Sequence, residues 1–417
     1  MKYISSLPEG LDAQFILKNF EKTNKNLLII CRDDRRLETV KAALLFFDPN
    51  LNFMTIPAWD CAPYEMISPN PRLVSERLAS LVNIIEKSEQ KVLYLTTLNA
   101  AAQYLPPQEI IKDCFLDILI GKQIDDQLLI KTLLEFGYIK SSIVSEPGEF
   151  AVRGGIIDIF TSGPDKAVRL DFFGDTIDKL RTFDVSSQLS IKNVKKIQLL
   201  PISEIVINDE TIKNFRSNFR NKFGVFGNQN ELYTGISERR RVQGIEQWLP
   251  LFYVNLESLF DYLPDATYFL DHDIKNNLLT RWDNICSQFR ARTSSRNKYE
   301  KQVNLSWCDP KTFYISPDIF DELLGSKNVI QISSLSLPPS PKNLNAMGKI
   351  GRKFFLERQS EEVYLFEALN IFLRELMGSK DVIIATNSEG SRTRLLELLK
   401  DEGNDNLSLI ENFNDIK

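Results

Sequence analysis

The chain has 417 residues, of which 43% are hydrophobic and 26% charged, and this is the composition of a globular protein. Its length predicts about three domains. The formal net charge of -5 argues against a protein whose main work is to grip nucleic acid over a wide surface, because that grip needs clustered lysine and arginine.

The cysteines are scattered and show no paired spacing, which argues against a zinc site and against a disulfide framework. They are Cys31, Cys61, Cys114, Cys286 and Cys308. This usage fits a reducing cytoplasm. No run of about eighteen apolar residues is present, so we expect a cytoplasmic protein without membrane contact.

The first hundred residues alternate between strand and helix patterns. Residues 26–31 form a continuous apolar run, typical of a strand that is buried on both faces, and a helical pattern follows from Leu37 to Phe47. A second apolar run at residues 91–96 comes after another helical pattern at residues 75–85. This alternation predicts an α/β domain with a parallel sheet.

Sheets of this kind hold nucleotides at the loop after the first strand, where a Gly-rich turn and a lysine cradle phosphate. The corresponding segment, residues 5–14, has one glycine, no Lys-Ser/Thr pair, and Glu9 where a bound phosphate would be repelled. No G-x-x-x-x-G-K-[ST] pattern occurs elsewhere in the chain. We therefore expect a nucleotide-binding topology without ATP hydrolysis and without a bound cofactor.

A proline-rich connector lies between the two strand-helix blocks. Its prolines predict an extended loop, and Ser75 is expected to cap the helix that follows. We interpret Trp59 and Tyr64 as side chains that plug the core, in preference to a binding loop.

The region from residue 146 to residue 184 has a different sequence pattern, in which short apolar runs alternate with clusters of Gly, Pro and Asp. The runs cover residues 155–160, 168–173 and 177–183. This pattern predicts a compact antiparallel sheet, and the helix expected at residues 125–136, which ends at Gly137, would be its scaffold.

Arg153, Arg169 and Phe173 are the candidate functional residues of that sheet. Alternation along the strand places Arg169 and Phe173 on one face. Arg and Phe are typical anchors of protein interfaces, so this face is a candidate recognition surface. Periodicity alone favours an ordinary exposed face, on which the arginines pair with Asp158 or Asp171.

Other polar groups are interpreted as surface or as turns. Arg181 is a further candidate for the same face but is expected to be solvated. The charge run at residues 238–241 is expected to be a solvated helix face and not a DNA contact. His272, between two aspartates, is expected in a turn at a strand end, because one loop does not supply convergent metal ligands.

The last third of the sequence predicts more helices and one boundary. Helices are expected at residues 209–223 and 274–292, with Trp248 in the core between them. The polar, Pro-rich link at residues 334–345 marks a domain boundary. Beyond it, a strand at residues 381–385 between helices at 361–376 and 391–401 predicts a small α/β unit.

Several segments together resemble the amino-terminal region of the bacterial transcription-repair coupling factors (Mfd), a region that is itself similar to the damage-recognition protein UvrB. They are Pro-Ala-Trp-Asp at residues 57–60, Ser-Glu-Arg-Leu at 75–78, GEFAVRGGIIDIF at 148–160 and VRLDFFGD at 168–175. With Gly-Ser-Arg at residues 390–392, the resemblance covers essentially the whole chain.

The resemblance implies a multidomain α/β fold. A helicase-like (RecA-like) domain with a degenerate nucleotide site would be built in two parts, residues 1–113 and 202–333. A small mixed α+β domain would be inserted at residues 114–201, and a small carboxy-terminal α/β unit would span residues 346–417. The family continues beyond this point, so the chain is expected to be a fragment or a naturally short form.

The resemblance also implies a function. The inserted domain of the family binds the repair protein UvrA, and three of its contact residues match Arg153, Arg169 and Phe173. The chain would be a non-catalytic adaptor that recruits UvrA to stalled RNA polymerase. RNA polymerase, DNA and ATP would be bound by family regions that are missing here. The alternatives are a UvrB-like module that binds damaged DNA, and a fragment of an ATPase or helicase.

Overall fold

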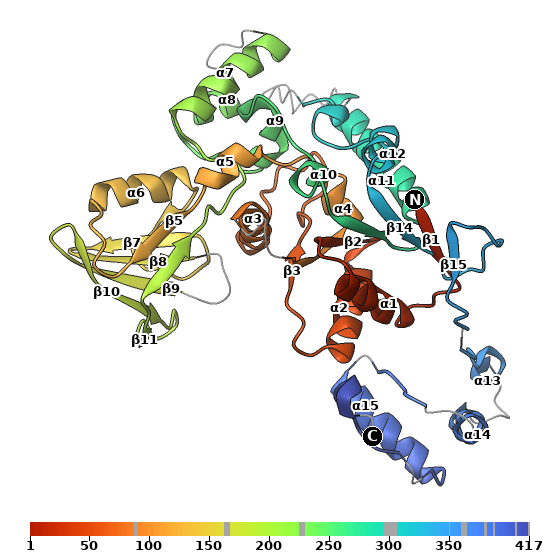
Figure 1. Ribbon diagram of the computed structural model, residues 1–417. Helices are drawn as coiled ribbons and strands as arrows, with labels where there is room; N and C mark the ends of the chain where they lie inside the picture. The colour runs from red at the N-terminus through yellow and green to blue at the C-terminus, as the bar shows by residue number, and fades with distance from the viewer. Residues whose placement is uncertain are drawn as a thin grey trace.

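The structure is a computed structural model in which the described residues are 1–86, 91–161, 167–224, 230–294, 307–349, 351–359, 365–378, 382–386, 388–404 and 407–415. Figure 1 shows a large sheet covered by helices, a second sheet domain beside it, and the carboxy-terminal helices on a separate arm. The start of the helix expected at residue 361 and the first residue of the strand expected at residues 381–385 lie outside the described residues.

The main sheet has seven parallel strands in the order β15-β1-β14-β13-β2-β4-β3. It is built from segments on both sides of the inserted domain, so the expected α/β fold is confirmed. The strand that precedes residue 26 was missed by the sequence analysis because it is short. The strands are β1 (Lys2–Ser5), β2 (Leu27–Cys31), β3 (Phe53–Ile56), β4 (Leu93–Thr97), β13 (Thr267–Leu270), β14 (Asn328–Ile332) and β15 (Asn343–Asn345).

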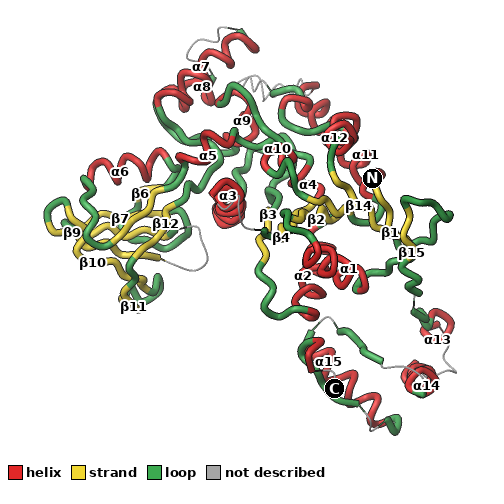
Figure 2. The backbone as a smooth tube through the Cα atoms, in the orientation of Figure 1, coloured by secondary structure: helices red, strands yellow, loops and turns green. Residues whose placement is uncertain are grey.

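Helices cover both faces of this sheet, as Figure 2 shows. Leu27 and Ile29 of β2 point to a core that they share with α1 (Leu11–Lys22) and α2 (Asp34–Phe47). Leu28 and Ile30 point to the opposite core. Burial on both faces is why this strand reads as a continuous apolar run. The opposite core is closed by α3 (Pro71–Glu86), α10 (Leu259–Tyr262), α11 (Ile274–Ser294) and α12 (Pro317–Gly325).

The inserted domain follows two short helices, α4 (Leu98–Ala101) and α5 (Gln108–Asp113). Its six-stranded sheet has the order β11-β10-β9-β8-β7-β6, and it is mixed because β6 and β7 pair in parallel. A two-stranded sheet of β5 and β12 and the helix α6 (Asp126–Glu135) cover one face. Its strands are β5 (Leu116–Leu119), β6 (Ile139–Lys140), β7 (Glu149–Arg153), β8 (Ile156–Phe160), β9 (Ala167–Phe173), β10 (Thr176–Phe183), β11 (Ser190–Asn193) and β12 (Lys196–Leu199).

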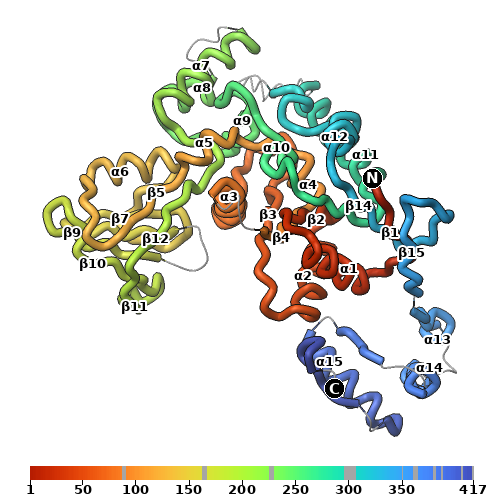
Figure 3. The backbone as a smooth tube through the Cα atoms, in the orientation of Figure 1, coloured from red at the N-terminus to blue at the C-terminus, as the bar shows by residue number. Residues whose placement is uncertain are grey.

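A third apolar core follows the return from the inserted domain. It contains α7 (Asp209–Phe223), α8 (Glu231–Ser237) and α9 (Leu249–Phe252). Trp248 is fully buried and stacks on Trp307 with ring centroids 4.6 Å apart, as expected for a core residue. Figure 3 follows the chain from the inserted domain through these helices and back into the main sheet.

The expected cap at Ser75 is wrong. Helix α3 begins at Pro71, whose fixed φ suits the first helical position, and Asn70 Oδ1 accepts a hydrogen bond from the Arg72 N–H. Ser75 is buried within the helix, and its hydroxyl donates to the carbonyl of Pro201. The serine therefore joins the helix to the end of the inserted domain.

The charge run at residues 238–241 is not a helix face, because α8 ends at Ser237. The backbone turns at Arg239, which has a φ of 59°. Arg241 then pairs with the buried carboxylate of Glu246, which follows it in the chain, at 2.8 Å. One member of this run is therefore part of the packing.

The last third of the chain differs from the sequence expectations in its strands. The Pro-rich link at residues 334–345 does not only separate domains, because β15 within it adds a strand to the main sheet beside β1. Residues 382–386 form no strand, and Ile383 and Ile384 are exposed. The described carboxy-terminal elements are the helices α13 (Phe355–Gln359), α14 (Leu365–Met377) and α15 (Glu389–Asp401) and a short 3-10 helix (Phe413–Asp415).

A buried ion pair ties the inserted domain to the main domain. Glu204, just after the inserted domain, lies 2.9 Å from Arg77 Nε of α3 and accepts a hydrogen bond of 2.9 Å from Trp59 Nε1. Burial raises the pKa of Glu204, and Arg77 opposes that rise. Trp59 also packs against Phe313, so the interpretation of this aromatic residue as structural is confirmed.

Replacing Arg77 should be far more costly than replacing an exposed arginine of the same helix. We expect Arg77→Met to lower the free energy of unfolding by about 3–5 kcal/mol, because it leaves the Glu204 carboxylate buried without its cation. Arg72→Met, on the exposed side of α3, should cost less than about 0.5 kcal/mol. Urea denaturation measures both, and similar losses would show that the ion pair is unimportant.

Candidate functional site

The loop between β1 and α1 lies at the carboxyl edge of the main sheet, where parallel sheets hold phosphate groups. Here the start of α1 binds a carboxylate of the chain itself. Asp12 is fully buried, and its Oδ1 accepts hydrogen bonds of 2.9 Å from the N–H groups of Gly10 and Ala13. Two backbone donors at the start of the helix, those of Gly10 and Ala13, are therefore already in use.

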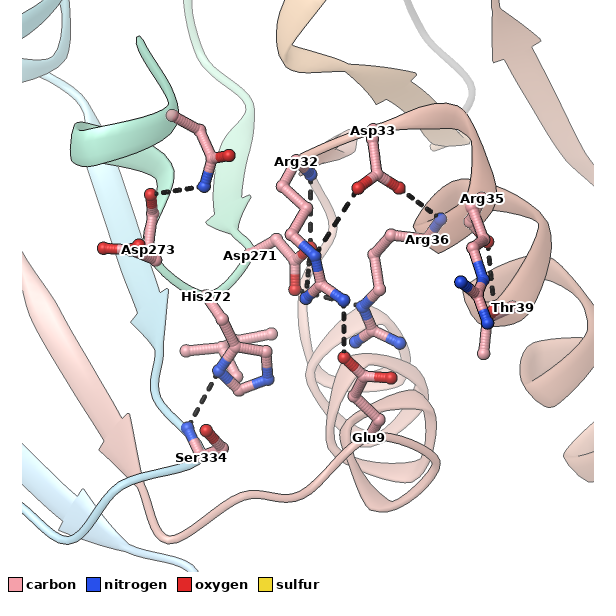
Figure 4. A network of polar contacts seen from close by, with 12 residues as sticks. Glu9, Arg32, Asp33, Arg35, Arg36, Thr39, Asp271, His272, Asp273 and Ser334 are labelled. Atoms are coloured by element: carbon pink, nitrogen blue, oxygen red, sulfur yellow. Dashed lines mark hydrogen bonds and ion pairs between the residues drawn. The ribbon is translucent and has the colours of Figure 1, made fainter. Parts of the chain in front are cut away.

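Two arginines of the next strand-helix connection neutralise the acidic groups around this loop, as Figure 4 shows. Arg36 is buried and pairs with Asp12 and, at 3.1 Å, with Asp271 after β13. Arg32 pairs with Glu9 at 2.8 Å and lies 3.6 Å from Asp271. Arg32 and Arg36 thus both have carboxylate partners within the chain.

The segment after β15 covers the same loop. Ala346 donates a backbone hydrogen bond to Ser5, and Gly348 donates one to Ser6. A side chain at position 348 would lie 2.5 Å from Pro8, so only glycine allows this close approach. The loop is therefore packed against the chain's own backbone on its outer side.

His272 lies beside this network and is held in a turn after β13. Its Nδ1 accepts a hydrogen bond of 2.8 Å from the Ser334 N–H, which places the proton of the neutral ring on Nε2. Burial lowers the pKa of His272. In the described part of the chain, no three His, Cys, Asp or Glu side chains converge as metal ligands would.

The candidate residues of the inserted sheet lie on its outer face, away from α6. Directly opposed residues of neighbouring strands share a face. The strand pairing places Arg153, Ile156 and Asp171 in one row across β7, β8 and β9. It places Asp158 and Arg169 in the next row. The sequence prediction that Arg169 and Phe173 share a face agrees with this arrangement.

Phe173 and Arg153 are open to solvent. Phe173 ends β9 at a tight turn, and 83% of its surface is exposed. Arg153 ends β7, and its guanidinium donates to the Ser142 carbonyl at 3.0 Å. An apolar ring and a guanidinium therefore project from the same face of a paired sheet.

Arg169 is held within the domain. Its guanidinium donates two hydrogen bonds, of 2.7 and 2.9 Å, to Asp158, which is buried, and it lies 4.8 Å from the ring centroid of Phe183. The hydrogen bond with Asp158 raises the pKa of Arg169. Only 17% of the Arg169 side chain is exposed. Of the ion pairs that periodicity favoured, Arg169–Asp158 is present, whereas Arg153 binds the Ser142 carbonyl. Arg181, which was expected to be solvated, pairs with Asp171.

Sequence reasoning missed the loop that supports Arg153. Burial opposes ionisation of Glu149, but hydrogen bonds from the N–H groups of Ser145 and Glu146 lower the pKa of Glu149 overall. This carboxylate orders the loop whose Ser142 carbonyl receives Arg153. The available signal was Glu149, four residues after Ser145, but spacing alone does not show that its carboxylate binds the backbone of this loop.

Residues 116–204 match the family model described as the UvrB interaction domain. A transcription-repair-coupling factor of Rickettsia typhi is 30% identical over 394 residues, which cover 94% of this chain and 34% of the relative. The corresponding protein of Escherichia coli is 31% identical over 349 residues, which cover 83% of this chain and 29% of the relative. The chain is homologous to the amino-terminal region of the transcription-repair-coupling factors. It spans about a third of the length of these relatives.

The comparison confirms the resemblance drawn from the sequence motifs. The matched family model begins at β5 and ends at Glu204, so it covers the six-stranded sheet, its outer face and the anchor of the Arg77 ion pair. None of the helices in the described ranges is long and apolar enough to cross a bilayer.

The three candidate residues should differ in their effect on stability. We expect Arg169→Ala to lower the free energy of unfolding by about 2 kcal/mol, because it leaves the buried Asp158 carboxylate without its partner. Phe173→Ala and Arg153→Ala remove exposed groups and should each cost less than about 0.5 kcal/mol. Thermal and urea denaturation of the full chain with each single substitution measures the three stability losses. An equal loss for all three variants would contradict the expectation.

The carboxyl edge of the main sheet should not respond to nucleotide. A ligand that binds only the folded state raises the melting temperature. We expect Mg-ATP in large excess to leave the melting temperature unchanged, because the α1 N–H groups already bind Asp12 and the nearby arginines are paired. Magnesium with sulfate at equal ionic strength is the control, and a rise specific to ATP would contradict this expectation.

Proposed function

We propose that this chain is a non-catalytic adaptor of the transcription-repair-coupling type, which recruits UvrA through the outer face of the inserted sheet. The observation that carries the proposal is the highly exposed Phe173, on the same sheet face as Arg153, in a domain that matches the UvrB interaction domain family. Large exposed aromatic residues next to arginine are typical of the centre of a protein interface.

The three residues would have different roles. Phe173 would enter an apolar pocket of UvrA, and Arg153 would pair with a carboxylate at the edge of that pocket. Arg169 would offer the small part of its guanidinium that remains exposed, and it would hold the sheet in shape through Asp158. We therefore assign Arg169 a contact and a positioning role together.

The other parts of the chain would be scaffold. Residues 1–113 and 202–333 would form the degenerate helicase-like domain around the insertion at residues 114–201, and residues 346–417 would form the following unit. Contacts with RNA polymerase, DNA and ATP would belong to parts of the relatives that this chain does not match. Those parts would then bring UvrA, bound to this chain, to the stalled polymerase.

The test measures binding of the purified chain to purified UvrA by surface plasmon resonance. We expect Phe173→Ala to weaken binding by about 2 kcal/mol or more, roughly thirtyfold, because an exposed interface aromatic loses its whole buried area. Arg153→Ala should weaken binding by about tenfold. Arg169→Lys keeps a cation and serves to separate loss of charge from loss of geometry.

Matched controls come from the same chain. Val254→Ala removes another highly exposed apolar side chain, and Arg220→Ala removes an exposed arginine that also contacts a backbone carbonyl. Both should leave UvrA binding unchanged. Undiminished binding by a folded Phe173→Ala, Arg153→Ala double variant would refute the site, and tight duplex DNA binding at physiological salt would favour the UvrB-like alternative.

A further inference from the structure

A cleft of about 680 Å³ lies between the inserted domain and the helices after it. Its walls come from α6 and β6, from the loop at residues 68–71 and from the turn at residues 239–243. Figure 2 labels α6, β6 and α8, the elements that lead into it. The volume is in the range of sites that hold a peptide segment or a small ligand.

The walls of this cleft are fixed by hydrogen bonds between the two domains. The N–H groups of Ile202 and Ile207 donate to the carbonyls of Phe136 and Glu135 at the end of α6. Arg241 donates to the carbonyl of Gly137, where any side chain would collide with its guanidinium. The cleft is therefore preformed and not a gap between loose parts.

The cleft floor is apolar, with exposed apolar side chains at its rim. Ile202 and Ile207 are buried at the floor, whereas Leu134 of α6 and Ile139 of β6 line the cleft with more than half of their surface exposed. Exposed apolar side chains that gather around a cleft mark an interaction site more often than scattered ones do. An occupant of this cleft would bury Leu134 and Ile139 together.

Strand β6 presents an unused edge in the same cleft. It is the last strand of the six-stranded sheet and pairs only with β7. The N–H groups of Ile139 and Ser141 donate to the carbonyls of Gly148 and Phe150, so the N–H and carbonyl of Lys140 between them point to the other side. Such an edge can accept an extended peptide as an additional strand.

The charged residues of the cleft are mostly basic. Lys131, Lys140, Arg239 and Arg241 line it, against the single carboxylate of Glu135. Arg241 is held by Glu246, Lys131 lies 3.8 Å from Glu135, and Arg239 pairs with the highly exposed Asp209. Lys140 has no ion pair in the described part of the chain. The free cation therefore sits on the strand whose edge is open.

We propose that this cleft binds an extended acidic peptide, which adds as a strand to the β6 edge, places apolar side chains against Leu134 and Ile139, and pairs a carboxylate with Lys140. The peptide would supply its own backbone N–H and carbonyl to Lys140. A nucleic acid fits less well, because it needs a continuous basic stripe along its backbone, and the apolar floor offers phosphates nothing.

The test uses a phage-displayed library of random peptides of about a dozen residues, selected on the full 417-residue chain. The expected enriched peptides alternate Val, Ile or Phe with Asp or Glu. Synthetic fluorescent copies of the enriched peptides should bind with an affinity that falls as salt rises, because a charge pair contributes. Lys140→Glu should weaken binding by about tenfold or more, since it replaces the attraction by repulsion.

The matched control is Lys192→Glu, which changes an exposed lysine on β11, the opposite edge strand of the same sheet. It should leave peptide affinity unchanged. Ile139→Asp should weaken binding, and a peptide with Lys in place of its acidic residues should not bind. Lys140→Glu should leave the UvrA affinity of the chain unchanged, so this proposal and the proposed function fail separately.

Four outcomes would overturn the proposal. The first is a selection that enriches no peptide, and the second is a set of peptides that lack acidic residues. The third is binding that survives Lys140→Glu but is lost in Lys192→Glu, which would place the peptide on the other edge. A duplex DNA of equal charge that competes for the cleft would also assign the basic rim to nucleic acid.

Discussion

The arrangement of the two sheet domains depends on the buried contact of Arg77 and Trp59 with Glu204. The chain leaves the main domain after α5 and returns only after β12. Non-covalent contacts must therefore hold the returning segment against the main domain. The Glu204 carboxylate is buried and has one cation and one indole donor as partners. A shift of the returning segment would leave its charge unpaired where water does not reach, so few other placements of this segment are stable. The pair thereby fixes the entry angle of the inserted domain, and with it the direction in which the outer face points.

The carboxyl edge of the main sheet shows the same use of charge for internal order. In a nucleotide-binding domain the helix N-terminus and nearby cations would face a phosphate. Here Asp12 occupies the helix N-terminus, and Arg36 is shared between that residue and Asp271. The topology of a nucleotide-binding sheet is therefore retained while its polar groups stabilise the fold, and a separate insertion supplies the exposed surface.

Much of this architecture was predictable from local patterns. The apolar run of β2 and the alternation along β9 follow from burial on two faces and on one face, and both were read correctly. Ser75 was misread because a serine before an apolar run resembles a cap, and only the distant Pro201 carbonyl explains its burial. The partners of Trp59 and Arg77 could not be found from spacing, since Glu204 lies 145 residues from Trp59. Contacts between distant segments carry no periodic signal.

Arg169 shows why the candidate site itself could not be resolved from sequence. The sequence allowed two interpretations of this residue, a member of an ion pair and an interface anchor. The structure shows the ion pair, and the interface role stays a proposal. Its guanidinium binds Asp158, the Gln188 carbonyl and the Phe183 ring, and 17% of the side chain remains exposed. Phe173, by contrast, is exposed and packs against little of its own chain, so it has no such structural reason to be aromatic.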